Sequence, residues 1–475
     1  MAQDLNPFSE IRKESLDVYN RLHSIEEDLD FVNVVHDSYP DLPLIPNLRC
    51  GAWYTDPARA TNVPAYFKST DGHFNNWSFN LRRSNLHLLS VIMENSGIIL
   101  VDSTRSGKRI PDALSKTVPI WCAVINRALR IRYPDINRDE WDDNLYTPPT
   151  TVSSQEHSQI SMRIYEWALA LTNSSFDLPK LPWPLRPFWI TPASTSFPKF
   201  SIDSDTRRHL PVICVSASKQ VHDGTERRTG GFSYIQGSGD DHELWGMGLF
   251  PETFWNEREQ LLSASRADLP DLIAALASNG STPSPKYVKA PEGISKISNR
   301  ISLSKLSELG LEPSLSLPHT AFILIDEAEV TKPTSPANPS TQADSTSPEQ
   351  KSEPGASLML EFKILGGKRS QAYFLHDVLP SSLRFIDDKL SHGLDIVIAC
   401  PSAKDLGVGV ALAAISQYFD DHGEYVKGGQ DLRLTKQTIR ARLEWIIASC
   451  PRANPSRTTL KRVNELLLTE EHLRR

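Results

Sequence analysis

The spacing of apolar residues divides the amino-terminal part of the chain into helices and short strands. The apolar runs at 97–102 and 212–216 predict two buried strands, and a helix is expected from about 111 through 131. An amphipathic helix is predicted over 11–31 by apolar residues at the spacing of one helical face, namely Leu16, Tyr19, Leu22, Ile25 and Leu29. These elements predict an α/β amino-terminal domain.

A second strand and helix pattern lies near the carboxyl end of the chain. Residues 379–390 predict a helix capped by Ser381, and the apolar strand that follows ends at Cys400. A short loop then leads into a helix that is apolar on every side. Such a helix start offers unpaired N–H groups and a partial positive charge, which is typical of a phosphate cradle. The expected cradle residues are Cys400, Ser402, Lys404, Asp405, Gly407 and Gly409.

The segment 331–356 is rich in Pro, Ser and Thr and contains almost nothing apolar. It cannot bury enough surface to offset its ordering entropy, so we predict a disordered insertion. The strand-like runs on either side of it, 320–325 and 358–364, are expected to belong to one sheet. A chain of 475 residues is too long for one core, and we expect an amino-terminal domain over 1–285 and a carboxy-terminal domain over 286–475.

Charge and cysteine content exclude several classes of protein. The net charge is −7, so any nucleic-acid site must be a local basic face on an acidic body. The five cysteines are an odd number without CxxC spacing, which indicates neither a disulfide framework nor a zinc site. No apolar run is long enough to span a bilayer. We expect a soluble cytoplasmic protein with reduced thiols and no membrane partner; the pattern does not predict an oligomeric state.

Three polar clusters are candidates for chemistry, and the first spans residues 67–87. Hydroxyls, Gly and Lys close together suit phosphate oxygens, and paired arginines suit phosphate or carboxylate. An ordinary polar turn before a helix is the alternative. The candidate ligands are Lys68, Ser69, Thr70, Asp71, His73, Arg82 and Arg83.

The second cluster follows the strand that ends at Val101. A buried strand leads into a loop rich in hydroxyls, Gly and cations, just before a helix expected near Pro111. This order places backbone N–H groups and cations around an anion, although a solvated basic loop would have the same composition. The candidates are Ser103, Arg105, Lys108, Arg109 and Lys116.

The third cluster is Asp240, Asp241, His242 and Glu243, which follows the glycines of Gln236–Gly239. Consecutive acids beside a His could coordinate Mg²⁺ or accept a proton from an attacking hydroxyl. Adjacent acids point in different directions, so not all of them can bind one ion. A surface turn that opens a helix is the alternative, because acids there favour the helix dipole.

The order of helix, strand, Cys loop and helix at 379–415 resembles the cysteine phosphatases of the dual-specificity type. Those enzymes need an Arg six positions after the Cys to grip the phosphoryl oxygens, and this chain has Leu406 there. The resemblance implies a phosphatase-like α/β domain that keeps the cradle and has lost the phosphatase chemistry. A cysteine phosphatase with Cys400 as nucleophile is therefore disfavoured.

Seven motifs in register resemble the initiator-tRNA ribosylphosphate transferases of fungi and plants. They are the Cys400 loop and the segments Gly51–Tyr54, Tyr66–His73, Trp77–Arg83, Val101–Arg105, Gly107–Thr117 and Tyr234–Trp245. The resemblance implies transfer of a 5-phosphoribosyl group from phosphoribosyl pyrophosphate to the 2′-hydroxyl of a T-stem purine, nucleotide 64, in initiator methionine tRNA. That mark would keep the initiator away from elongation factor.

The resemblance also implies roles for the clusters. Proton transfer would fall to Asp240, Asp241, His242 and Glu243, with Mg²⁺ at Asp240 and Asp241, and the first two clusters would hold the donor phosphates. Ala403 and Gly407 depart from the family pattern of Gly and Ser at these positions, which removes φ freedom and a hydroxyl donor. A non-catalytic adaptor, in which an inactive phosphatase-like domain binds phosphate or RNA, is the alternative function.

Overall fold

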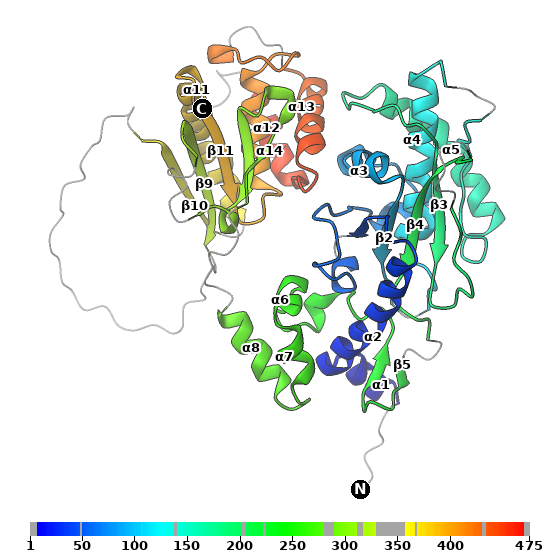
Figure 1. Cartoon of the computed structure of the whole chain (residues 1–475). Coiled ribbons are helices and arrows are strands. Elements are labelled where there is room, and N and C mark those ends of the chain that lie inside the picture. Colours follow the sequence, from blue (N-terminus) through cyan, green and yellow to red (C-terminus); the bar gives the residue numbers. More distant parts are fainter. Residues whose placement is uncertain are drawn as a thin grey trace, which may run out of the picture. The chain divides into compact units, whose positions relative to one another are not determined.

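The computed structural model shows a mixed α/β protein (Figure 1). It describes residues 7–47, 50–105, 107–136, 140–200, 206–221, 225–279, 289–310, 317–328, 357–365, 368–429 and 434–469. The insertion predicted over 331–356 lies outside these residues.

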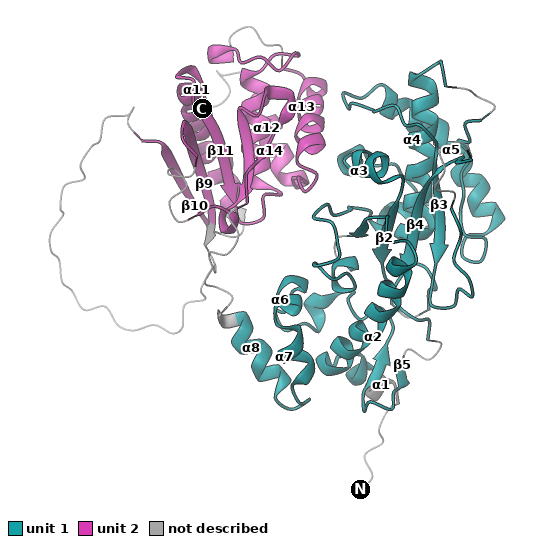
Figure 2. Ribbon diagram, viewed as in Figure 1, with its two compact units in different colours: residues 1–283 teal, residues 284–475 magenta. Residues whose placement is uncertain are grey.

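The chain divides into two compact units, residues 1–283 and residues 284–475 (Figure 2). The division falls two residues before the boundary expected from the sequence pattern. Within the described ranges, no helix is both long and apolar enough to cross a membrane.

Unit 1 is built on a parallel four-stranded sheet of order β1-β2-β4-β3. Every residue of β2 and β4 is buried, which is expected for central parallel strands covered on both faces. Both strands confirm the apolar runs predicted from the sequence. The bounds are β1 Leu44–Pro46, β2 Ile98–Asp102, β3 Leu185–Ile190 and β4 Leu210–Ser216, with a separate antiparallel pair β5 Thr225–Arg227 and β6 Ser233–Ile235.

The helix predicted over 11–31 is two helices, because the chain breaks at Asp17. The side chain of Asp17 caps α2 by accepting a hydrogen bond from the backbone N–H of Asn20 at 2.9 Å. The helix expected from about 111 begins instead with a π-helical turn, Ala113–Thr117 (η4), that continues into α4. The helices of unit 1 are α1 Pro7–Leu16, α2 Val18–Asp37, α3 Leu88–Asn95, α4 Val118–Arg132, α5 Ser154–Thr172, α6 Pro251–Asn256, α7 Arg258–Ser263 and α8 Leu269–Asn279.

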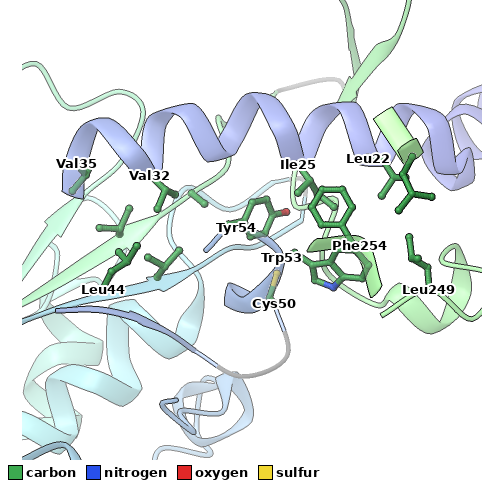
Figure 3. Packing of buried hydrophobic residues seen from close by; sticks show 14 of the residues in the cluster. Leu22, Ile25, Val32, Val35, Leu44, Cys50, Trp53, Tyr54, Leu249 and Phe254 are labelled. Atoms are coloured by element: carbon green, nitrogen blue, oxygen red, sulfur yellow. The ribbon is translucent and has the colours of Figure 1, made fainter. Parts of the chain in front are cut away.

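One apolar cluster joins α2 to the sheet and to the segments that carry the polar clusters. Leu22 and Ile25 of α2 are fully buried in it together with Trp53, Tyr54 and Phe254 (Figure 3). Burying large aromatic side chains contributes roughly 1.5–3 kcal/mol each. The cluster therefore fixes the loop at 50–55 and the segment after β6 against one rigid helix.

Unit 2 contains a five-stranded sheet of order β10-β9-β11-β8-β7, parallel except for β7. The two runs that flank the predicted insertion are confirmed as parallel neighbours in this sheet. The strands are β7 Glu292–Gly293, β8 Ile301–Lys305, β9 Thr320–Ala328, β10 Met359–Leu365 and β11 Asp395–Cys400. The helices are α10 Lys368–Tyr373, α11 Leu379–Ser391, α12 Leu406–Tyr418, α13 Lys436–Ser449 and α14 Arg457–Leu468.

The helix starts of unit 2 include one whose cap was predicted from the sequence. The Ser381 cap is wrong: α11 begins at Leu379 directly after a π-helical turn over Phe374–Val378, so Ser381 already lies in its first turn. Helix α14 is capped by Ser456, whose side chain accepts the backbone N–H of Thr459 at 3.1 Å. Helix α12 is buried on almost every side, as its composition predicts.

Candidate functional site

The polar clusters of unit 1 gather at the carboxyl ends of its parallel strands. Asn47, which follows β1, donates from Nδ2 to the Phe67 carbonyl and to Oδ2 of Asp102, each at 2.8 Å. Its Oδ1 accepts the Phe67 N–H at 2.9 Å. One buried amide thus ties the first cluster to the end of β2, at the edge where ligands commonly bind in parallel α/β sheets.

The first two clusters also meet directly. Thr117 Oγ1 donates to the Lys68 carbonyl at 3.0 Å. Gly72 packs so closely that a Cβ there would lie 2.7 Å from the Asp112 carbonyl oxygen. His73 follows, with its Nε2 3.7 Å from Asp112 Oδ2. The turn Ser69–Gly72 (η2) therefore rests on the π-helical turn of the second cluster.

Asp112 is the centre of a charge network that the sequence pattern did not single out. Its side chain is 9% exposed and binds Lys108 Nζ at 2.5 Å and Lys116 Nζ at 3.1 Å. Lys116 also binds Glu156 Oε1 at 3.1 Å, and that oxygen accepts the Trp77 indole N–H at 2.9 Å. Glu156 belongs to α5, 40 residues from Lys116, so no local motif could indicate this partner.

A cavity of about 730 Å³ opens beside this network. Its volume is in the range of small-molecule and cofactor sites. Three lysine or arginine side chains and one imidazole border it against a single carboxylate, so it suits an anion. The lining residues are His73, Phe74, Gly107, Lys108, Arg109, Asp112, Lys116, Thr150, Thr151 and Gln220.

The third cluster reaches the second through Arg105. The Arg105 guanidinium lies 2.9 Å from Asp241 Oδ2 and 3.8 Å from Asp240 Oδ2. Gln236 Nε2 donates to the Lys108 carbonyl at 2.6 Å and to the Thr104 carbonyl at 3.3 Å. The structure thus brings all three clusters of unit 1 together, as candidates for one site.

A buried network under the third cluster was missed by the sequence analysis. Asp28 of α2 accepts hydrogen bonds from Ser218 Oγ at 2.5 Å and from the Tyr234 hydroxyl at 2.6 Å. Ser218 Oγ in turn accepts the Gly237 N–H at 3.1 Å. Burial raises the pKa of Asp28 to about 8, although the two hydroxyl hydrogen bonds oppose the shift. An Asp among the buried positions of α2 was the available signal.

His242 and Glu243 do not accompany the two aspartates. The His242 ring lies among aromatic side chains, with ring centroids 5.7 Å from Trp53 and 5.6 Å from Phe250. The Glu243 side chain is 65% exposed. Adjacent residues on a tight turn point in different directions. Here the two aspartates face Arg105, whereas the His242 ring lies among aromatic side chains.

The Mg²⁺ site expected at Asp240 and Asp241 stays a prediction. Both carboxylates contact the one Arg105 guanidinium, Asp241 Oδ2 through Nη1 and Asp240 Oδ2 through Nε. Among the described residues, no group of three or more His, Cys, Asp or Glu side chains is arranged to hold a metal. Mg²⁺ commonly uses one or two carboxylates together with substrate phosphates, which agrees with a two-carboxylate site.

Several candidates of the first two clusters lie outside the cavity lining. Arg83 Nη2 donates to both carboxylate oxygens of Asp71 at 2.8 Å, so these two residues neutralise each other. Arg82 shares the short 3₁₀ turn of Arg83. Ser103 Oγ bonds Ser218 Oγ at 2.6 Å within the buried network. Lys68 and Thr70 are exposed, and Ser69 is half-buried.

The Cys400 loop of unit 2 is held by the segment before α14. The Lys404 carbonyl accepts the Asn454 N–H at 2.9 Å, and Asp405 Oδ1 accepts the Ser456 N–H at 2.8 Å. Ala403 adopts the left-handed φ of +51° that a Gly would tolerate more easily. Ser402 Oγ accepts the Lys404 N–H at 3.3 Å.

The two glycines of the loop face protein atoms. A Cβ on Gly407 would lie 3.1 Å from Cys400 Sγ, and a Cβ on Gly409 would lie 2.6 Å from Thr459 Cγ2. The Gly409 N–H donates to the Asp405 carbonyl at 2.9 Å. These contacts give both glycines a packing role, and phosphate binding at this loop remains a prediction.

Comparison with known proteins covers both units. Family models described as the Rit1 N-terminal domain and the Rit1 DUSP-like domain match residues 11–278 and 359–467. The second match identifies unit 2 as a phosphatase-like domain. A solved structure of a human DUSP28 variant is 12% identical, with a TM-score of 0.23, and the match covers 38% of this chain and 94% of that one.

Two fungal proteins are similar over nearly their full length. The tRNA A64-2′-O-ribosylphosphate transferase of Saccharomyces cerevisiae is 36% identical over 97% of this chain and 94% of its own. An uncharacterized protein of Schizosaccharomyces pombe is 34% identical over 95% of this chain and 94% of its own. With a domain model that spans more than half of the chain and a relative of this similarity, the chain belongs to the Rit1 family.

Proposed function

We propose that this protein is a glycosyltransferase that moves a 5-phosphoribosyl group from phosphoribosyl pyrophosphate to a tRNA 2′-hydroxyl. The acceptor would be the purine at position 64 of initiator methionine tRNA, in the cytoplasm. The cation-lined cavity at the end of the unit 1 sheet carries the proposal. The printed name of the Saccharomyces cerevisiae relative supports the reaction and the A64 position.

The donor is a sugar with three phosphate groups, and its reaction separates charge. As the bond from C1 to the diphosphate lengthens, positive charge grows on the ribose and negative charge on the departing group. Lys108, Arg109 and Lys116 border the cavity and can bind that developing negative charge. Asp112 holds Lys108 and Lys116 in place through its ion pairs, so the cations are positioned before the donor arrives.

The third cluster would bind the donor through Mg²⁺. Asp240 and Asp241 are the residues that would hold it, and the ion, when bound, would neutralise charge on the diphosphate. The Arg105 ion pair and the Gln236 hydrogen bonds keep this loop beside Lys108.

The acceptor is an RNA duplex, which proteins recognise by shape, 2′-hydroxyls and phosphates rather than by base edges in the deep groove. A protein of net charge −7 can bind such a duplex through local basic surfaces only. The proposed enzyme would also discriminate initiator from elongator tRNA, which an assay with mixed tRNA can test.

The deciding experiment is incubation of the full-length protein with labelled phosphoribosyl pyrophosphate, Mg²⁺ and mixed tRNA. We expect label in the initiator tRNA alone, at nucleotide 64, and no transfer when EDTA is added. If the protein binds tRNA normally but no label enters the tRNA, the adaptor function would replace the proposed transferase.

Asp241→Ala separates catalysis from binding. We expect it to abolish transfer while tRNA affinity stays near that of the wild type, because Asp241 is one of the two residues that would hold Mg²⁺ and it pairs with Arg105. Asp41→Ala, at an exposed position after α2, is the matched control and should leave both properties unchanged. Equal loss of affinity and transfer in Asp241→Ala would favour the adaptor.

A further inference from the structure

One imidazole borders the cavity. His73 follows the turn Ser69–Gly72, and its side chain is 48% exposed toward the site that the proposed donor would occupy. Its Nε2 faces Asp112 Oδ2 at 3.7 Å. In the part of the chain that the structure describes, no hydrogen bond involves its Nδ1. An imidazole with one nitrogen toward a carboxylate and the other open is the arrangement of a general base.

Asp112 is suited to orient that imidazole. Its carboxylate is 9% exposed and is held from one side by Lys108 and from the other by Lys116. A carboxylate fixed in this way can stabilise an imidazolium that forms beside it, as the aspartate does in a catalytic triad. The 3.7 Å separation is longer than a hydrogen bond, and such contacts commonly tighten only when substrate binds.

Neighbouring contacts hold the backbone around His73 in place. The close packing of Gly72 on the Asp112 carbonyl fixes the residue immediately before it. The His73 carbonyl accepts the Asn76 N–H at 2.9 Å, and the Asp71 carbonyl accepts the Ser78 N–H at 3.0 Å. The turn therefore presents the imidazole at the rim of the cavity instead of leaving it on a loose loop.

The other titratable groups of the site are less suited to take a proton. Asp240 and Asp241 face the Arg105 guanidinium and do not border the cavity. His242 packs between aromatic rings, and only 14% of its side chain is exposed. Lys108 and Lys116 are ion-paired cations and can only donate.

We propose that His73, positioned by Asp112, is the general base of the transfer; this inference rests on the function proposed above. The O–H bond of the RNA 2′-hydroxyl breaks, and its proton passes to Nδ1 of His73. The hydroxyl oxygen forms the new bond to C1 of the ribose. The bond from C1 to the diphosphate breaks, and its electron pair leaves with the diphosphate. Asp112 faces the positive charge that His73 then carries.

The test measures chemistry apart from binding. His73→Ala is compared with wild type in single-turnover assays at saturating donor and tRNA, where we expect the rate to fall roughly 10²- to 10⁴-fold. Affinities for tRNA and for phosphoribosyl pyrophosphate, measured separately, should change by no more than about threefold, as expected when an interaction of the transition state is removed. Added imidazole should restore part of the rate in His73→Ala and have no effect on wild type.

Asn76→Ala is the matched control, because Asn76 is an exposed residue of the same turn whose backbone carries its contact. It should transfer at the wild-type rate. Asp112→Asn should lower the rate by a smaller factor than His73→Ala. Since Asp112 also holds two lysines, the thermal unfolding midpoint of Asp112→Asn is measured as well. His73→Gln is a second variant at position 73 that keeps the side-chain volume.

The possible outcomes distinguish a failure of the His73 assignment from a failure of the proposed function. Wild-type protein that transfers nothing would refute the transferase, before His73 is considered. If the wild type is active and His73→Ala and His73→Gln transfer at the wild-type rate, the general-base assignment is overturned while the proposed function stands. Loss of donor affinity in His73→Ala without imidazole rescue would assign His73 to phosphate binding, which also overturns it.

Discussion

Asp28 is a buried acid of α2, with 3% of its surface exposed. It is buried between α2 and the segments after β4 and β6, and its partners are the hydroxyls of Ser218 and Tyr234. Through Ser218 it supports the Gly237 N–H and hence the turn that carries Asp240 and Asp241. Burial raises its pKa to about 8, so a proton is bound in the folded state at pH values where an unfolded Asp has lost it.

This shift predicts a pH dependence of stability. The contribution of Asp28 is fully present below the unfolded pKa near 4 and is lost as pH rises toward the folded pKa of about 8. Between these values the group should lower the free energy of unfolding by about 1.4 kcal/mol per pH unit. We expect Asp28→Asn to remove that slope in urea unfolding at pH 5 to 8. The exposed Asp41→Asn should keep it, and identical slopes in all three proteins would contradict the pKa shift.

Gly237 offers a second test at the scale of one residue. Its φ is +68°, and a Cβ there would lie 2.5 Å from the backbone of Thr104 and Arg105. Gly231 has a similar φ of +80° with nothing within 4 Å of the added atom. Both alanine variants carry the left-handed backbone cost, about 1–2 kcal/mol. We expect Gly237→Ala to lose a further ~1–3 kcal/mol and most transfer activity, because the second and third clusters are forced apart.

Thermal unfolding and the transfer assay on these two variants measure the difference. Equal loss of stability in Gly231→Ala and Gly237→Ala would show that backbone conformation alone is responsible. Full activity in Gly237→Ala would show that the third cluster need not touch the second.

At the scale of elements, apolar runs predicted β2, β4 and β9 because a central strand must be buried on both faces. The edge strand β10 was predicted from the strand-like run that flanks the insertion. Helix starts were less predictable. The π-helical turns before α4 and α11 shift hydrogen bonding by one residue and leave the apolar spacing nearly intact, so the pattern cannot reveal them.

The position of the candidate site could be predicted from the strand ends. The hydrogen bonds and ion pairs that connect its residues could not. Polar segments after β2 and β6 could be recognised in the sequence because loops after buried strands carry Gly, hydroxyls and charges. The partners Glu156 and Asp28 lie on distant helices, and their pairing is a consequence of tertiary packing. The assignment of His242 as a companion of the aspartates rested on adjacency, which a tight turn does not preserve.

The packing of α12 against α14 gives a prediction at this scale. Because a Cβ on Gly409 would meet Thr459 Cγ2 at 2.6 Å, Gly409→Ala should destabilise unit 2 by about 1–3 kcal/mol. Thr459→Ser removes that methyl and keeps the hydroxyl that faces Ser456. The double variant should recover part of the loss, and a double-mutant cycle in urea measures the coupling. Additive effects would place the strain elsewhere, for example at Phe374.

The whole molecule joins a unit with a cation-lined cavity to a phosphatase-like unit, and family similarity extends over both. The question at this scale is whether the second unit contributes chemistry. Its Cys400 is buried at the end of β11, and Leu406 stands where a dual-specificity phosphatase has its Arg. A thiolate nucleophile without that cation lacks its main means of binding and stabilising a phosphoryl group.

Cys400→Ser should therefore leave tRNA modification near the wild-type rate, and neither protein should hydrolyse a generic phosphate ester. The exchange of sulfur for oxygen keeps the small volume that Gly407 allows beside Sγ, so the fold should tolerate it. Cys450→Ser, at another buried thiol of unit 2, controls for the cost of placing a hydroxyl in the core. If phosphate-ester turnover occurs in wild type and vanishes in Cys400→Ser, the thiol is a nucleophile after all. If tRNA modification vanishes in Cys400→Ser with Cys450→Ser active and both folded, unit 2 takes part in the transfer itself and the reaction cannot be confined to the cavity of unit 1.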